Sequence, residues 1–173
     1  AANWNGSALH NTAPNYISDM TISGRIAGGV IGNYNIQGSF RMDGVVLEDN
    51  EIIGKQTVAD KDYSAGGVIG AIYTTDASEI RVYNTKLYRN TIVNEIAGSS
   101  LSNKQGASEV DHLAVGGFLG RTYQSTNNRI GDIWCDNLVM DSTNKVGVRQ
   151  KNTNTVQLIT YANDKYQLAD VEL

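Results

Sequence analysis

The sequence predicts an all-β protein folded as a β-solenoid, a parallel β-helix of about three coils with inserted loops. Three observations predict this fold: a six-residue phrase that recurs along the chain, a composition that favours strands, and apolar spacings that repeat after each copy of the phrase. A β-sandwich whose turns happen to repeat is the alternative fold.

The composition favours sheet over helix. Of the 173 residues, 18 are glycine and only 1 is proline, while valine, isoleucine, threonine and tyrosine are plentiful. β-Branched and aromatic residues fit strands, few prolines permit uninterrupted strands, and glycine suits tight bends. The length allows one domain over residues 1–173 or a piece of a longer repeat protein, and the start without methionine predicts a processed or excised fragment.

The repeated phrase defines the period of the chain. It reads AGGVIG, AGGVIG and VGGFLG at residues 27–32, 65–70 and 115–120. It divides the chain into repeat units of about 27–64, 65–114 and 115–146. Repeats of this size are typical of stacked architectures, in which equivalent residues lie above one another and meet the same steric problem. We therefore expect Gly28, Gly66 and Gly116 to stack at one corner.

The same apolar and polar residues follow each phrase. Two apolar residues stand five apart in every unit, at Met42 and Leu47, Val82 and Leu87, and Ile133 and Leu138. A polar turn former comes three residues later, as Asn50, Asn90 and Asp141. The pattern predicts a strand, a tight turn and a second strand, with Asn50 and Asn90 stacked as an asparagine ladder.

Three tyrosines follow the phrases at nearly equal offsets, as Tyr34, Tyr73 and Tyr123. Stacked inside the molecule, they would form an aromatic ladder in the core. On the outside, they would form a platform for a sugar or a protein.

Two inserted segments, 54–64 and 94–114, interrupt the alignment at the same point of the repeat. We expect both to leave the scaffold on one side, where repeat proteins usually bind partners. Apolar alternation at Met20 and Ile22 predicts a strand of a preceding partial coil, and Val156 begins a last strand. No capping helix is predicted, so the ends would meet further copies or neighbouring parts of a longer solenoid.

Charge and composition exclude several classes of partner. The net charge is −4 and no basic cluster exists, so a nucleic acid is not expected. No apolar run is long enough to span a membrane. The single cysteine, Cys135, lies in a strand-like run and is expected to be a small buried hydrophobe.

Residues with catalytic or metal-binding chemistry are sparse, and we predict no catalytic, cofactor-binding or metal site. The common zinc and serine-nucleophile motifs are absent. Weak metal candidates are His112 with Asp111 and Glu109, and Asp60 with Asp62 for calcium. A carboxylate pair for polysaccharide cleavage would come from Asp43, Glu48, Asp49, Asp132 and Asp136, most of which stand at turn positions.

The phrase and the strand residues that follow it resemble the GLUG motif. That motif occurs in tandem in large bacterial surface and secreted proteins, including zinc-dependent immunoglobulin A1 proteases and filamentous adhesins. The resemblance covers about half the chain, although Val30 and Val68 replace the usual leucine and the units are longer. It implies a β-helical spacer or display region, secreted or at the cell surface, without catalytic residues.

These observations lead to an expected function. We expect a non-enzymatic structural or adhesive module whose loops bind a host or bacterial surface protein or glycan. The alternatives are a carbohydrate-active β-helix, either a lyase or a hydrolase, and a coat or fibre subunit that assembles through its ends.

Overall fold

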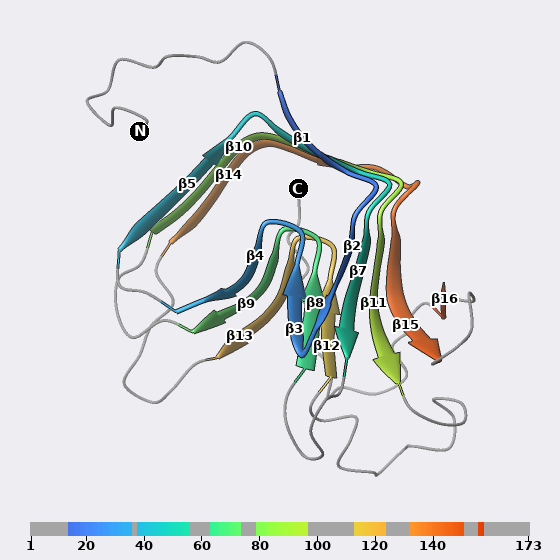
Figure 1. Ribbon diagram of the computed structural model, residues 1–173. Coiled ribbons are helices and arrows are strands. Elements are labelled where there is room, and N and C mark those ends of the chain that lie inside the picture. Colours follow the sequence, from blue (N-terminus) through green and yellow to red (C-terminus); the bar gives the residue numbers. More distant parts are fainter. Residues whose placement is uncertain are drawn as a thin grey trace, which may run out of the picture.

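The structure is a computed structural model, and it describes residues 14–35, 38–55, 63–73, 79–96, 113–123, 132–150 and 156–157. Every helix or strand assigned in these ranges is a β-strand, which confirms the predicted all-β class. The strands form four sheets, which we name A to D (Figure 1).

Sheets A and B contain the longer strands. Sheet A consists of β1 (Asn15–Ser18), β5 (Ser39–Asp43), β6 (Val45–Glu48), β10 (Glu79–Tyr88) and β14 (Ile133–Met140). Sheet B consists of β2 (Thr21–Gly24), β7 (Glu51–Lys55), β11 (Thr91–Ile96), β15 (Lys145–Gln150) and β16 (Val156–Gln157).

Sheets C and D are formed around the repeated phrase. Sheet C consists of β3 (Ile26–Gly28), β8 (Tyr63–Gly66) and β12 (Leu113–Gly116). Sheet D consists of β4 (Ile31–Tyr34), β9 (Ile69–Tyr73) and β13 (Leu119–Tyr123).

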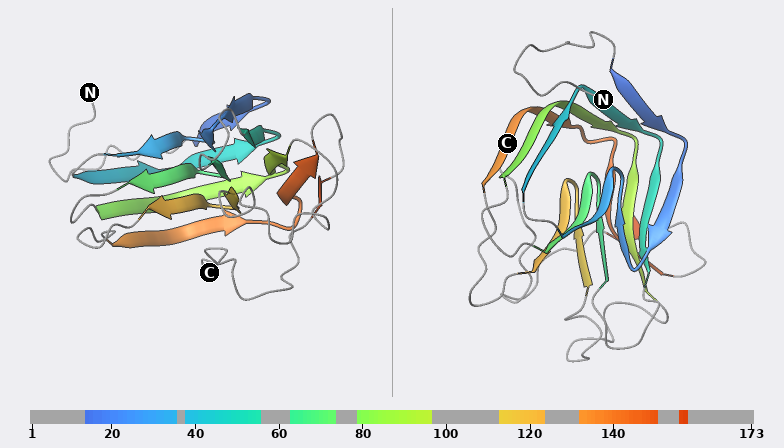
Figure 2. Two further views of the ribbon diagram at one scale, coloured as in Figure 1. Left: turned by 90° about the horizontal axis from the view of Figure 1, so that it is seen from below. Right: turned by 60° about the vertical axis from the view of Figure 1, so that its left-hand side comes forward.

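Apart from β16, neighbouring strands in every sheet come from successive passes of the chain and run parallel. The chain passes through sheets C, D, A and B in that order three times, as β3 to β7, β8 to β11 and β12 to β15. We call these the first, second and third sets; β1 and β2 precede them as a partial set. The sets lie in tiers in chain order (Figure 2, left), an arrangement compatible with a β-helix. Only β16 pairs antiparallel among the described strands, against β15.

The repeated phrase forms a tight turn that joins sheet C to sheet D and points towards sheets A and B (Figure 1). Gly28, Gly66 and Gly116 are in register, as predicted. A Cβ atom on Gly66 would overlap the carbonyl oxygen of Ile69 in its own turn and would lie 2.6 Å from the backbone nitrogen of Gly120 in the next set. Glycine is therefore needed here for space.

The second glycine of the phrase faces the core. A Cβ atom on Gly67 would lie 2.7 Å from Leu87 Cδ2 and 2.9 Å from Ile92 Cδ1, two residues that flank the turn between sheets A and B. The crest of the turn thus packs directly against the opposite corner of the molecule, and each set fills its own interior. The largest fully buried apolar side chains are Tyr63, Leu47, Ile52, Ile69, Ile72, Ile80, Leu87, Ile92, Val68, Val82, Val93 and Val148.

One predicted alignment is wrong in the third set. Val82 is in register with Cys135 and Leu87 with Met140, so the equivalent apolar pair is Cys135 and Met140 instead of Ile133 and Leu138. Both pairs are spaced by five residues and are made of apolar residues, so apolar spacing alone does not detect a shift of two residues.

Candidate functional site: the asparagine corner

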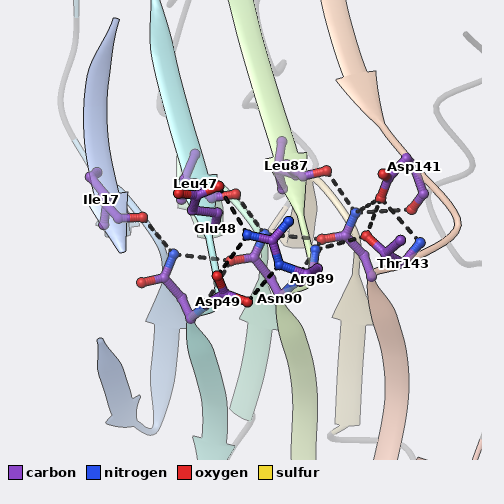
Figure 3. A network of polar contacts seen from close by, with 11 residues as sticks. Ile17, Leu47, Glu48, Asp49, Leu87, Arg89, Asn90, Asp141 and Thr143 are labelled. Carbon is purple, nitrogen blue, oxygen red and sulfur yellow. Dashed lines mark hydrogen bonds and ion pairs between the residues drawn. The ribbon is translucent and has the colours of Figure 1, made fainter. Parts of the chain in front are cut away.

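The turns that join sheet A to sheet B carry a stacked set of asparagine side chains, which we call the asparagine corner (Figure 3). Its members are Asn50, Asn90 and Asn144, one from each set. Asn50 and Asn90 are buried, and Asn144 is partly buried.

The hydrogen bonds at this corner repeat from one set to the next. The Asn50 backbone N–H and side-chain Nδ2 donate to Asn90 Oδ1 at 3.1 and 3.0 Å. The Asn90 backbone N–H and Nδ2 donate to Asn144 Oδ1, both at 3.0 Å. Each Nδ2 also reaches back to a carbonyl of the preceding set: Ile17 for Asn50 and Leu47 for Asn90. The predicted asparagine ladder is confirmed.

The third ladder member was assigned wrongly from the sequence. Asn144, and not Asp141, occupies the ladder position, because the third turn is one residue longer than the turns at Asn50 and Asn90. Asp141 instead lies beside the ladder, and its carbonyl accepts hydrogen bonds from the backbone and side chain of Asn144.

A charged cluster covers the outside of the corner. Arg89 Nε and Nη2 donate to the two carboxylate oxygens of Asp49, both at 2.8 Å, and Arg89 Nη2 also lies 3.1 Å from Glu48 Oε2. The hydrogen bond from Arg89 holds the pKa of Asp49 below its usual range. Asp49 and Arg89 both have positive φ angles, 55° and 53°, and stand just before the ladder asparagines.

A second ladder of polar side chains, on the surface at the bend inside sheet A, was missed in the sequence. Asn137 Nδ2 donates to Asn84 Oδ1 and Asn84 Nδ2 donates to Asp43 Oδ1, both at 2.9 Å. Asn84 and Asn137 adopt positive φ, as does Gly44. The signal in the sequence was the residue type, since asparagine and glycine are the residues that most readily adopt this conformation.

The five carboxylates proposed as catalytic candidates do not form one cluster. Glu48 and Asp49 lie in the charged cluster around Arg89, on the outside of the asparagine corner. Asp43 lies in the surface ladder and forms an ion pair with Arg41 at 3.2 Å. Asp136 is exposed on β14, and Asp132 is exposed just before that strand begins. Asp136 is equivalent in register to Asp43, with Tyr83 between them.

The three tyrosines do not form one ladder. Tyr73 and Tyr123 are in register, but Tyr34 is in register with Ile72, the residue before Tyr73. Because side chains alternate along a strand, this shift turns Tyr34 into the core, where it is 3% exposed and its ring lies 6.1 Å from that of Phe40. Burial raises the pKa of Tyr34.

A buried arginine crosses sheet B. Arg149, on β15, forms ion pairs with Glu51 on β7 and with Glu95 on β11, the latter at 3.4 Å. The Arg149 side chain is 10% exposed and that of Glu95 is 15% exposed. One arginine thus joins strands from all three sets. The Arg149 Nε atom has no partner in the described part of the chain.

The bases of the inserted segments lie side by side. The predicted bounds were too wide, because residues 54–55, 63–64, 94–96 and 113–114 belong to strands; residues 56–62 and 97–112 are outside the described ranges. Strand β7 pairs with β11 and β8 with β12, so both insertions leave and return at adjacent positions. Asn94 Nδ2 donates to the Ala114 carbonyl at 2.5 Å and ties the two ends of the longer insertion together.

The weak metal candidates His112, Asp111, Glu109, Asp60 and Asp62 fall outside the described residues. Among the residues that are described, no group of three or more histidine, cysteine, aspartate or glutamate side chains is placed to hold a metal. The same part of the chain has no helix long and apolar enough to cross a membrane. Cys135 packs against the core but is only partly buried, where full burial was predicted, and this burial raises the pKa of its thiol.

Comparisons with known proteins leave the chain without a match among family models, curated proteins or solved structures. The resemblance to the GLUG motif therefore rests only on the repeated phrase and the strand residues that follow it.

Proposed function

We propose that the chain is a β-solenoid scaffold without catalytic activity, which carries its inserted segments as display loops on one side. The observation that carries this proposal is the parallel, in-register pairing of equivalent strands from successive sets in all four sheets. In this reading, each set is one coil, and residues 1–173 form one solenoid domain or part of a longer one.

The position of the insertions supports the display role. From the partial set to the first set, the chain passes from β2 to β3 through Arg25 alone. The equivalent connections are residues 56–62 and 97–112, so the same corner tolerates very different lengths. Changes in the length of a surface loop cost little free energy, about 0.6 kcal/mol per doubling, so such a corner is suited to variable binding segments.

The hydrogen bond from Arg89 argues against one of the candidate carboxylates, Asp49, as a general acid. A general acid for glycoside cleavage needs a raised pKa, whereas the arginine beside Asp49 lowers the pKa of that group. From the resemblance of the repeated phrase to the GLUG motif, we further propose that the scaffold belongs to a secreted or surface-exposed bacterial protein and binds a protein or glycan.

The proposal is tested by two variants of the full chain. Deleting residues 97–108 and closing the gap with a short Gly-Ser turn should leave the melting temperature nearly unchanged and remove binding on a glycan array or to a surface protein. Gly66→Val should lower the melting temperature strongly, because its side chain would overlap the Ile69 carbonyl. A deletion that melts the protein while Gly66→Val does not would contradict the division into scaffold and loop.

A polysaccharide-degradation assay on the same samples separates binding from turnover. Binding without chain cleavage supports the scaffold. Cleavage that is lost when one carboxylate, such as Asp136, is replaced by asparagine would instead support a carbohydrate-active β-helix.

One observation favours a second candidate, a subunit that assembles through its ends. The four exposed large apolar side chains of the described residues lie in the partial set before the first set or on β14 in the third: Tyr16, Met20, Trp134 and Met140. Sedimentation velocity over a range of concentrations tests this candidate, which predicts a mass that rises with concentration.

A further inference from the structure

The hydrogen bonds of the asparagine ladder follow one rule inside the stack. For Asn50 and for Asn90, the backbone N–H and the side-chain Nδ2 both donate to the Oδ1 atom of the asparagine in the next set, at 3.0–3.1 Å. A ladder that continued past Asn144 would need the same two donors of Asn144 to be free for an oxygen in a fourth layer.

Those two donors are already occupied within the third turn. The Asn144 backbone N–H donates to the Asp141 carbonyl at 3.2 Å, and Asn144 Nδ2 donates to the same oxygen at 2.9 Å. Nδ2 also lies 3.2 Å from Asp141 Oδ1. Asp141 therefore takes the place that the next asparagine oxygen has in the two earlier layers.

One extra residue makes this contact possible. Three positions separate Leu47 from Asn50, and Leu87 from Asn90, whereas four separate Met140, the register partner of Leu87, from Asn144. The shorter turns use a left-handed residue just before the asparagine, and Thr143 in the longer turn is not left-handed. Asp141 Oδ1 also accepts the Thr143 backbone N–H at 3.1 Å, which holds the longer turn in shape.

The opposite end of the ladder lacks an acceptor. Met20 stands in the position of the asparagines, because Thr21, the next residue, is in register with Glu51. The Met20 backbone N–H donates to Asn50 Oδ1 at 3.1 Å. Met20 is 52% exposed, and its thioether is only a weak acceptor that offers no amide oxygen to donors from another layer.

We propose that Asp141 closes the asparagine ladder at one end and Met20 leaves it without an acceptor at the other, so that this corner does not continue from one copy of the protein into a second copy. This inference goes beyond the scaffold role. A copy that docks on the exposed Trp134 or Met140 must do so without extending the ladder, which disfavours a fibre that grows by regular stacking at this corner.

Hydrogen exchange measured by NMR on the full chain tests the closure. In the wild-type protein the Asn144 backbone amide should be protected, as the backbone amides of Asn50 and Asn90 are. Deleting Asp141 restores the three-position spacing between Met140 and Asn144. We expect the protection of the Asn144 amide to fall about five- to tenfold, as for one net hydrogen bond, with Asn50 and Asn90 unchanged.

The control variant is Asp141→Asn, which keeps the backbone carbonyl, an Oδ1 acceptor for the Thr143 amide and the turn length, and should leave the Asn144 amide protected. An unprotected Asn144 amide in the wild-type protein would overturn the proposal. Loss of protection at Asn50 together with Asn144 in the deletion variant would also overturn it, because Asp141 would then hold the register of the whole corner.

Sedimentation velocity tests the consequence for self-association. The variant that combines Met20→Asn with deletion of Asp141 has an acceptor at one end and free donors at the other. We expect it to associate more strongly with rising concentration than the wild-type protein and either single variant. Wild-type association that Asn144→Ala abolishes would overturn the proposal, as would a double variant that behaves like the wild type.

Discussion

Single asparagine side chains carry most of the side-chain hydrogen bonding at the corner between sheets A and B. Asn90 has no exposed surface, yet its side chain meets both neighbouring layers: it accepts from Asn50 and donates to Leu47 and Asn144. A buried polar group that loses its partner costs about 1–3 kcal/mol. The ladder is therefore a feature in which one substitution affects three layers.

Asn90→Ala should lower the free energy of unfolding by about 3–5 kcal/mol, because it strands the Leu47 carbonyl and the donors of Asn50 together. Urea denaturation measures the change. The matched control is Asn84→Gly in the exposed ladder, which suits the positive φ of 48° and should stay within about 0.5 kcal/mol. Equal effects of the two variants would contradict the distinction between the buried and the exposed ladder.

The Arg89–Asp49 pair gives a prediction about pH. Because the pKa of Asp49 is lowered in the folded state, its stabilising contribution is present above the unfolded pKa, about 3.9, and is lost as the pH falls through the folded pKa. Arg89→Asn keeps a residue that tolerates the left-handed turn, and it should raise the pKa of Asp49 towards 3.9. Carboxyl titration by NMR measures this shift; Arg81→Gln, which removes the partner of Glu79, should leave Asp49 unchanged.

At the scale of the element, the repeated phrase forms one turn, and its three glycines have different steric surroundings. The first two make room for the backbone and for the core. The third faces the preceding set, so its environment depends on the layer. A Cβ atom on Gly70 would lie 2.5 Å from the carbonyl oxygens of Ala27 and Gly32, whereas on Gly32 it would meet only the Ile26 carbonyl, at 3.3 Å.

Gly70→Ala should therefore destabilise the protein by about 1–3 kcal/mol through overpacking, while Gly32→Ala should change the stability by less than about 0.5 kcal/mol. The two substitutions are identical in chemistry and in position within the phrase. Thermal unfolding of both variants decides the matter, and a larger loss for Gly32→Ala would contradict the tiered arrangement of the sets.

At the scale of the whole molecule, Arg149 couples the three sets across sheet B. Arg149→Met should lower the free energy of unfolding by about 2–4 kcal/mol, because it leaves the largely buried Glu95 carboxylate without its arginine partner. Adding Glu95→Gln removes that uncompensated charge and should recover part of the loss. Urea denaturation of the single and double variants measures the coupling; a double variant less stable than Arg149→Met would contradict this explanation.

The sequence predicted features that depend on local chemistry repeated at a fixed period. The stacked Gly28, Gly66 and Gly116 and the Asn50–Asn90 ladder were predictable because each position imposes the same steric or hydrogen-bonding demand in every layer. The third unit was misaligned because Cys135 and Met140 are as apolar as Ile133 and Leu138. The Arg149 contacts were not predictable, because they join residues 54 and 98 positions apart through side-chain packing alone.

The Arg149 ion pairs bear on how the protein would respond to being pulled. Force applied along the direction in which the sets are layered would peel strands apart one hydrogen bond at a time, the weakest way to load a sheet. Arg149, on the third set, also binds carboxylates of the first and second sets. Separating β15 from β11 therefore requires that its contact with β7 break as well. These ion pairs would add resistance to the separation of the three layers under tension, because β15 is held to β7 and β11 by side chains in addition to its strand ladder with β11.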